Sequence, residues 1–330
     1  MSQQQTVFVS APSRLHFGLL SFGNPEVRQF GGVGTMIDRP GLKLRIQAAA
    51  AFETAGPMQD RVRDAALQWL ESSNNSMELR CRIELISAPR LHVGLGVGTQ
   101  LALAVATGLN AFHSRATPAI KDLATSVGRG LRSAVGTYGF AAGGLIAERG
   151  KLPNETVSPL LERVPLPNQW RFVLVSPPGS VGLHGTTEQT AFDQLPPVPT
   201  AVTERLTGIL CDRILPAVKS ASFLDFSDAV YDFGFLAGSC FESVQGSAYN
   251  GPQLKNLVKR IRAIGVRGVG QSSWGPTIYA ICDSEANAIA FTNDLLHLQS
   301  GDDHCEIVIA SPDNHGARVS TDCGSDSGGL

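Results

Sequence analysis

The feature that most limits the fold of this chain is a glycine-rich turn, Gly94-Leu-Gly-Val-Gly98, followed at once by an apolar stretch. The alternating segment Cys81–Ile86 before the turn predicts a strand, and the apolar residues after it predict a helix over Thr99–Phe112. A glycine turn between a strand and a helix presents unpaired backbone N–H groups to an anion, and the helix dipole favours negative charge there. The spacing matches neither the P-loop nor the Rossmann pattern, so a phosphate site and a simple turn before a core helix both stay open.

The rest of the chain predicts an α+β protein with two domains. Its 330 residues and 43% hydrophobic content are enough to bury a substantial core. The Pro-rich stretch Pro153–Pro167 predicts a boundary, which gives domains at 1–155 and 156–330. Beyond it, strands alternate with helices, as expected for a sheet with helices on one face.

Hydrophobic periodicity predicts the individual elements. Before the boundary we expect strands over Thr6–Ser10, Leu15–Phe22, Leu42–Ala49 and Cys81–Ile86, a helix over Asp60–Glu71, and tight turns between short strands in Gly128–Gly150. After it we expect strands over Trp170–Ser176, Gly265–Gly270, Thr277–Cys282 and Glu306–Ala310 and a helix over Ser284–Leu298, while the tail from Thr321 frays.

Composition and charge exclude several classes of protein. A net charge of −2 lacks the electrostatic footprint of a general nucleic-acid binder. The N-terminus has no signal-peptide pattern, and the longest apolar stretch is too short to span a membrane. The six cysteines are widely spaced without a Cys-x-x-Cys pair, which favours free thiols. We therefore expect a cytoplasmic protein with small-molecule partners and no nucleic-acid or membrane partner; a homodimer is also an expectation.

Three motifs, in order along nearly the whole chain, resemble those of the GHMP superfamily of galacto-, homoserine, mevalonate and phosphomevalonate kinases. Ala11-Pro-Ser-Arg-Leu-His-Phe-Gly18 is similar to the first motif, the loop at Gly94–Gly98 to the phosphate loop, and Gly268–Thr277 to the third motif. This resemblance implies a GHMP-type two-domain fold. Its N-terminal domain would be ribosomal-protein-S5-like and carry the phosphate-binding loop, and its C-terminal domain would be ferredoxin-like.

Two features differ from the kinases of that superfamily. Their loop usually reads Gly-Leu-Gly-Ser-Ser-Ala, where a serine helps to hold Mg²⁺, but here Val97 and Gly98 replace both serines and Thr99 is displaced by one position. Several of those kinases use an acidic base after the loop helix, but Gly128–Gly144 contains no Asp or Glu. An ATP-dependent small-molecule kinase is therefore the alternative hypothesis, and a non-catalytic ligand-binding relative is a third.

A more specific resemblance is to the β-ribofuranosylaminobenzene 5′-phosphate synthases of tetrahydromethanopterin biosynthesis. It lies in Arg14-Leu-His-Phe-Gly18, in Arg28 to Gly34, in Gly128-Arg-Gly-Leu-Arg-Ser133 and in Gly270-Gln-Ser-Ser-Trp-Gly-Pro-Thr277, although Gln29 stands where we expect an acidic residue. The resemblance implies a pentosyltransferase that joins phosphoribosyl pyrophosphate to 4-aminobenzoate or 4-hydroxybenzoate and releases CO₂ and pyrophosphate. It implies Mg²⁺ with the pyrophosphate and no organic cofactor; ATP belongs only to the kinase alternative.

The motifs supply the candidate site residues. Arg14 and His16 alternate on one predicted strand and therefore share a face. The expected catalytic residues are Arg14, His16, Arg28, Gln271 and Ser272; the expected phosphate-binding residues are Gly94, Gly96, Gly98, Thr99, Arg129, Arg132 and Ser133; and the expected substrate-binding residues are Ser273, Trp274 and His92.

For each candidate an ordinary structural role stays open: a solvated strand edge, a loop charge, a polar turn or, for Trp274, core packing. His184 is a weaker candidate, no zinc-type spacing occurs, and the metal ligands are not assigned.

Overall fold

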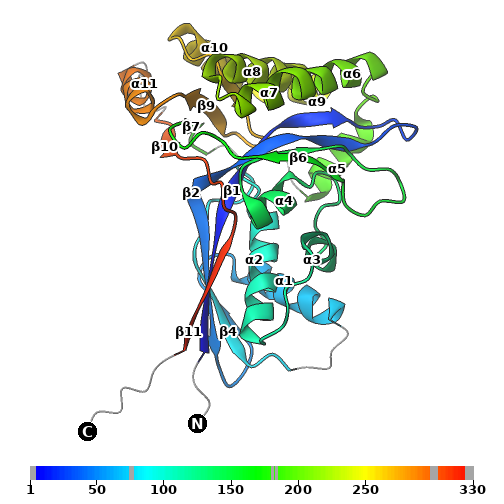
Figure 1. The fold of residues 1–330 in the computed structure, drawn as a ribbon, viewed down its shortest axis with the longest axis vertical. Helices are drawn as coiled ribbons and strands as arrows, with labels where there is room; N and C mark the ends of the chain where they lie inside the picture. Colours follow the sequence, from blue (N-terminus) through cyan, green and yellow to red (C-terminus); the bar gives the residue numbers. More distant parts are fainter. Residues whose placement is uncertain (1–4, 74–77, 180–181, 183–184, 298–303, 324–330) are drawn as a thin grey trace.

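A long antiparallel hairpin organises the molecule. The computed structural model describes residues 5–73, 78–179, 182, 185–297 and 304–323. Strands β1 (Gln5–Ser21) and β2 (Phe30–Ala48) pair along their length and run from the sheet at one end of the molecule to the helices at the other (Figure 1). Their register shifts at two bulges, between Ala11 and Ser13 and between His16 and Gly18.

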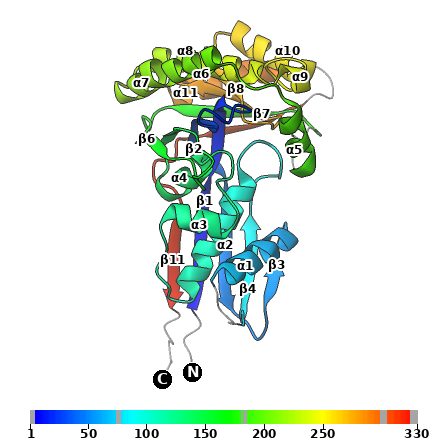
Figure 2. The ribbon, with the colours of Figure 1, turned by 90° about the vertical axis from the view of Figure 1, so that its right-hand side faces the viewer.

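The hairpin is the centre of a large sheet. In the described ranges this sheet has seven strands in the order β11-β1-β2-β4-β3, with β5 paired to β2 and β6 to β5. Figure 2 shows β11 and β1 running side by side toward the end where both termini lie. The other strands are β3 (Glu53–Ala55), β4 (Cys81–Ser87), β5 (Leu145–Glu148), β6 (Leu160–Val164) and β11 (Arg318–Cys323).

Helix α2 forms the core of this half of the chain. It covers Val97–Phe112 and is buried without interruption from Gln100 to Asn110, because it packs against the sheet on one side and other helices on the other. Gly108 lets the helix approach the sheet, since a Cβ there would lie 2.8 Å from Cδ1 of Ile46. The neighbouring helices are α1 (Gln59–Ser72), α3 (Ile120–Ser126) and α4 (Val135–Ala142).

A second sheet lies near the other end of the hairpin, with helices on both faces. Its described strands have the order β10-β7-β9-β8. Phe172 and Leu174 of β7 pack with α8 and β1, whereas Val173 and Val175 alternate to the opposite face and pack with α10 and α11. The strands are β7 (Arg171–Ser176), β8 (Val269–Gln271), β9 (Ile278–Cys282) and β10 (Glu306–Ala310).

Most helices of this half form a layer over the small sheet in Figure 1, but the first of them lies below this layer. They are α5 (Gly185–Gln194), α6 (Thr200–Gly208), the π-helical turn η1 (Ile209–Ile214), α7 (Leu215–Lys219), α8 (Phe223–Ser239), α9 (Glu242–Gln245), α10 (Gly251–Ala263) and α11 (Glu285–His297). Across the described part of the chain, no helix combines the length and the apolar character that a membrane span requires.

The α+β class and most of the predicted elements agree with the structure. The prediction for Gly128–Gly150 is wrong in part, because this segment contains helix α4 before the short strand β5. The expectation of helices on one face of the second sheet is also wrong, because α8 packs on one face and α10 and α11 pack on the other. The tail prediction is wrong for residues 321–323, which pair with β1 as part of β11. The division at 155/156 stays a prediction for folding units, but the sheets divide the chain differently, because β6 and β11 both belong to the large sheet.

Candidate functional site

A cavity of about 300 Å³ is lined by residues from both halves of the chain. Strand β1, the start of α2 and the loop before α4 contribute from the first half, and α5, α8 and the end of β8 contribute from the second. Nine of the residues expected from the sequence line it: Arg14, His16, Thr99, Arg129, Arg132, Ser133, Gln271, Ser273 and Trp274. The first and third motifs and the segment 128–133 therefore meet around one cavity. Of the phosphate-loop candidates only Thr99 lines it, whereas Gly94, Gly96 and Gly98 lie outside the lining.

The glycine turn leads directly into α2, as the sequence predicts, but the helix begins two residues earlier, at Val97. Gly96 precedes the first turn with a left-handed φ of 71°, which favours glycine. A Cβ on Gly96 would lie 3.2 Å from Cβ of Arg14, and a Cβ on Gly94 would lie 2.2 Å from the carbonyl oxygen of Ser272. The glycines are thus required because the first and third motifs pack directly against the loop.

Two guanidinium groups beside this turn have unsatisfied hydrogen-bonding capacity. Arg14 and Arg129 are both partly buried, and Nε of each has no hydrogen-bond partner among the residues that the structure describes. Nη1 of Arg14 makes a long hydrogen bond, of 3.4 Å, to the carbonyl of Gly94. Burial lowers the pKa of Arg14 to about 10, against the attraction of Glu148 and Glu188. Burial, and then the charge of Arg61, also lower the pKa of Arg129. Because two partly buried cations without ion pairs lie at one cavity, this arrangement favours an anionic ligand.

A chain of hydrogen bonds runs from the cavity into the protein interior. Nε2 of His16 lies 3.0 Å from Oγ of Ser133, which donates to Oε1 of Glu148 over 2.6 Å. The backbone N–H of Ala134 donates to Oε2 of Glu148 over 2.8 Å. Burial, and then the charge of Arg14, hold the pKa of His16 well below its usual value, so the imidazole is neutral. Burial raises the pKa of Glu148, against the hydrogen bonds from Ser133 and Ala134.

Ser272 ties the three motifs together. Its hydroxyl accepts from the backbone N–H of His16 over 3.1 Å and donates to the carbonyl of Gly94 over 2.7 Å. Ser272 is fully buried and is not among the residues that line the cavity. Gln271 does line it, with Oε1 accepting from the Asn250 backbone and Nε2 donating to the Ser273 carbonyl.

Part of the cavity lining is aromatic. Phe192, Phe241 and Trp274 contact one another nearly at right angles, with ring centroids between 4.9 and 5.8 Å apart. The guanidinium of Arg132 lies 4.7 Å from the centroid of Phe192 and forms an ion pair with Glu188. A lining that combines aromatic and cationic side chains suits a ligand with a planar ring and an anionic part.

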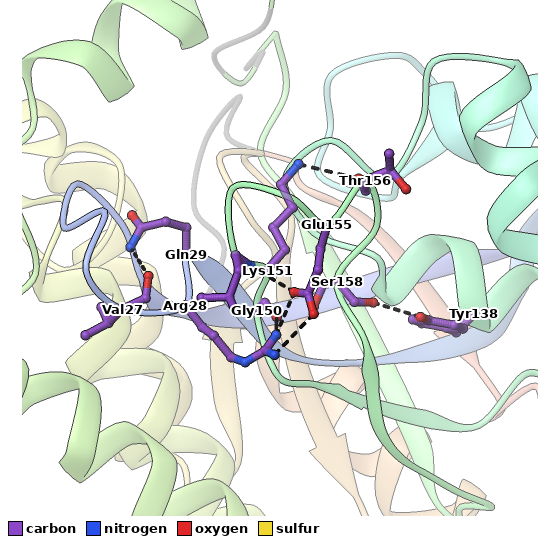
Figure 3. A network of polar contacts seen from close by, with 10 residues as sticks. Val27, Arg28, Gln29, Tyr138, Gly150, Lys151, Glu155, Thr156 and Ser158 are labelled. Atoms are coloured by element: carbon purple, nitrogen blue, oxygen red, sulfur yellow. Dashed lines mark hydrogen bonds and ion pairs between the residues drawn. The ribbon is translucent and has the colours of Figure 1, made fainter.

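Some expected site residues are placed elsewhere. Arg28 is not in the cavity lining: its Nη1 donates to Glu155 over 2.7 Å and to the carbonyl of Gly150 over 2.9 Å. Figure 3 shows the Arg28 side chain directed at Glu155 and Gly150. His92 also lies outside the lining, where its carbonyl accepts from the Gly182 backbone over 2.8 Å. His184 falls outside the described residues.

Sequence reasoning missed several groups at the site. Glu148, Glu188 and the aromatic residues Phe192 and Phe241 were not candidates. The one available signal was the acidic Glu148 at the end of the apolar strand Leu145-Ile-Ala. Segment 128–144 indeed has no acid, but Glu148 lies four residues beyond it and reaches Ser133.

The site has few metal-ligating groups of its own. Among the described residues, no group of three or more His, Cys, Asp or Glu side chains is placed to hold a metal ion. The lining contains one described carboxylate, Glu188, and the hydroxyl of Thr99 near the start of α2. Mg²⁺ characteristically keeps water ligands and binds through one or two carboxylates together with substrate phosphates. This donor set therefore fits Mg²⁺ that enters with a phosphorylated ligand.

The chain is similar to known proteins both in its sequence and in its fold. Residues 214–297 match the family described as GHMP kinases C terminal. The chain is 26% identical to β-ribofuranosylphenol 5′-phosphate synthase of Methanothermobacter thermautotrophicus, over 86% of this chain and 91% of that protein. It is 28% identical to the enzyme of the same name from Archaeoglobus fulgidus, over 93% of this chain and 97% of that protein.

Among solved structures, homoserine kinase from Cytophaga hutchinsonii is similar in fold. The TM-score is 0.63 at 17% identity, with 97% of this chain and 99% of that chain covered. This likeness and the family match confirm the resemblance to the GHMP superfamily, and the chain has the α+β fold of the GHMP kinases.

Proposed function

We propose that this GHMP-fold protein is a β-ribofuranosylphenol 5′-phosphate synthase. It would condense phosphoribosyl pyrophosphate with 4-hydroxybenzoate and release CO₂ and pyrophosphate. The observation that carries the proposal is a cavity in which two guanidinium groups, those of Arg14 and Arg129, have an unsatisfied Nε and no ion pair, and which is also lined by aromatic side chains. The two archaeal relatives bear the name of this activity, and that name favours the phenol over the aminobenzene product.

The cationic side of the cavity would bind the leaving group. As the bond between C1 of the ribose and pyrophosphate breaks, negative charge accumulates on pyrophosphate and positive charge on the ribose carbon. Arg14, Arg129 and the start of α2 would stabilise the departing anion in a partly buried site, where charge-assisted hydrogen bonds are strong. The guanidinium groups are in place before the ligand arrives, which reduces the reorganisation that the reaction requires.

The aromatic side would hold the benzoate ring against the ribose carbon. The ring carbon that bears the carboxylate forms the new bond to C1, and the electrons of the breaking bond to CO₂ then restore aromaticity. The ring loses no proton in this sequence, so no group in the cavity has to abstract one from carbon. Phe192, Phe241 and Trp274 supply the stacking and edge contacts that orient a planar ring.

Mg²⁺ belongs to the proposal as a companion of pyrophosphate, whose charge it would share. Glu188 and Thr99 are the side-chain oxygen donors that would face it from the lining. Glu188 is already paired with Arg132, so the protein would supply one carboxylate at most and the substrate oxygens the rest. A homodimer and a cytoplasmic location stay predictions.

The test is release of ¹⁴CO₂ from carboxyl-labelled 4-hydroxybenzoate in the presence of phosphoribosyl pyrophosphate and Mg²⁺. We expect release with 4-hydroxybenzoate and a lower rate with labelled 4-aminobenzoate, measured side by side. Failure to release CO₂ from either ring would refute the proposal. Thermal stabilisation by MgATP together with phosphorylation of a small alcohol would instead identify a kinase.

A further inference from the structure

The interior contains an acidic group that the reaction outlined above does not use. Glu148, at the end of β5, is completely buried, and no Lys, Arg or His side chain of the described chain forms an ion pair with it. Burying a carboxylate without a cationic partner is costly, so its presence behind the cavity needs an explanation. It reaches the cavity through one intermediate, Ser133, and that intermediate contacts His16.

We propose that Glu148 is a positioning residue that acts through Ser133 on His16, and that the three side chains form a relay for the hydroxyl proton of 4-hydroxybenzoate. This inference rests on the proposed function and deepens it, because it assigns protein groups to the ring hydroxyl as well as to the reaction at the carboxylate.

The hydrogen-bond count around Ser133 fixes the tautomer of His16. The Ser133 hydroxyl has one hydrogen, and the 2.6 Å contact directs it to Oε1 of Glu148. Its oxygen also accepts from the backbone N–H of Val135 over 3.2 Å. The contact of 3.0 Å with Nε2 of His16 must then be donated by the imidazole. Nε2 therefore bears the proton of neutral His16, and Nδ1 is the nitrogen left to accept another.

The start of helix α4 stabilises the ionised form of Glu148. Its Oε2 accepts from the N–H of Ala134, the residue immediately before the first turn, so the carboxylate lies at the positive end of the helix. Together with the Ser133 hydroxyl, this contact provides donors to both carboxylate oxygens. A buried carboxylate held in this way can polarise Ser133 without lining the cavity itself.

The relay would take up the hydroxyl proton of the substrate early in the reaction and return it later. The ring attacks more readily when its hydroxyl oxygen gives up a proton, because the oxygen electrons then move into the ring and generate a dienone as the new carbon–carbon bond forms. The proton passes to Nδ1 of His16, the Nε2 proton to Oγ of Ser133, and the Ser133 proton to Glu148. When CO₂ leaves, its bonding electrons regenerate the aromatic phenolate, and the proton returns along the same path. No proton is gained or lost overall.

The decisive experiment compares two substrates on the same variants. In 3,5-difluoro-4-hydroxybenzoate, two fluorines acidify the hydroxyl, so that the ring arrives largely as the phenolate and needs no relay. The variants are Glu148→Gln and Ser133→Ala, with Ser133→Thr as the variant that keeps a hydroxyl. Tyr138→Phe is the matched control, since it removes a nearby buried hydrogen bond, from Tyr138 to the Ser158 carbonyl, and leaves the side chains of Glu148, Ser133 and His16 in place. Thermal melting of each variant verifies folding.

We expect Glu148→Gln and Ser133→Ala to lower kcat with 4-hydroxybenzoate by about a hundredfold, a typical loss for a proton-transfer group. The difluoro substrate should lose far less, and Ser133→Thr should recover most of the rate with the parent substrate. Equal losses on both substrates would show that Glu148 has only a structural role, and no loss on either would also overturn the relay. If the wild-type protein releases no CO₂ from either ring, the proposed function itself fails.

Discussion

Arg14 packs directly on Gly96: a Cβ built on Gly96 would lie 3.2 Å from both Cβ and Nε of Arg14. The backbone N–H of Arg14 also donates to the carbonyl of Leu95 over 3.0 Å. The first strand and the glycine turn therefore position one guanidinium between them. A side chain added at Gly96 would therefore affect the cavity by displacing Arg14.

Gly96→Ala should lower both stability and ligand binding. The left-handed φ of 71° penalises any Cβ by about 1 kcal/mol, and the contact with Arg14 adds to this. We expect a lower Tm and a smaller Tm increase with pyrophosphate and Mg²⁺, both measured by thermal shift. Gly98→Ala is the stability control, because its Cβ would meet Arg129 Nη1 at an ordinary 3.7 Å. Equal Tm values for Gly96→Ala and wild type would contradict the packing argument.

Arg14→Met should separate stability from activity. It removes a partly buried cation that has no ion pair and an unsatisfied Nε, so the Tm should stay the same or rise. The loss of one charge-assisted contact of about 1.5–3 kcal/mol should lower kcat/KM for phosphoribosyl pyrophosphate roughly ten- to a hundredfold.

Arg28→Met is the comparison for Arg14→Met, since Arg28 binds Glu155 outside the cavity lining. It breaks a half-exposed ion pair, which is typically worth about 0–1 kcal/mol, and should leave kcat/KM nearly unchanged. A larger activity loss for Arg28→Met than for Arg14→Met would contradict the assignment of the cavity.

His16 should make the fold less stable in acid. Its pKa is lowered in the folded state, so unfolding takes up a proton once the pH falls below the unfolded value of about 6.5. Stability should therefore fall with decreasing pH below that value, by at most about 1.4 kcal/mol per pH unit for this group. His113, whose pKa is also lowered, contributes in the same direction. Urea unfolding between pH 5 and 7.5 measures this effect. The free energy of unfolding should decrease less at low pH for His16→Gln than for wild type.

Ser272→Ala should loosen the contact between the motifs. The substitution removes the partner of the buried N–H of His16 and leaves the carbonyl of Gly94 with only the long contact of 3.4 Å from Nη1 of Arg14, at a cost of about 1–3 kcal/mol. Ser273→Ala, at the exposed neighbouring position, should cost much less. Guanidinium unfolding of the two variants measures the difference in the free energy of unfolding. If Ser272→Ala lowers it no more than Ser273→Ala does, the hydrogen bonds of Ser272 are not important for stability.

The sequence predicts the elements whose signal is local. Helix α2 is evident because a continuous apolar stretch follows the glycine turn, and Arg14 and His16 share a face because strand residues alternate. Helix α4 was missed because its glycines suggest turns. In the structure Gly139 is required by packing instead, since a Cβ there would lie 2.2 Å from Sδ of Met36.

Groups that depend on distant partners could not be predicted. Glu148 acquires its role only because β5 pairs with β2 and brings its carboxylate to Ser133. Arg28 has the same charge as Arg14, but Glu155, more than a hundred residues away in sequence, directs it away from the cavity. No local pattern distinguishes these two arginines.

The two bulges of β1 limit how this strand can change in length. They flank the short section that carries Arg14 and His16. Because side chains alternate between faces, removing one residue at either bulge would turn this section over relative to the rest of the strand. The sheet would still pair, but both side chains would point away from the cavity. Single-residue insertions and deletions should therefore be tolerated in the loop between β1 and β2 and rejected between Ala11 and Gly18, which makes the spacing of this strand as important to the site as its residues.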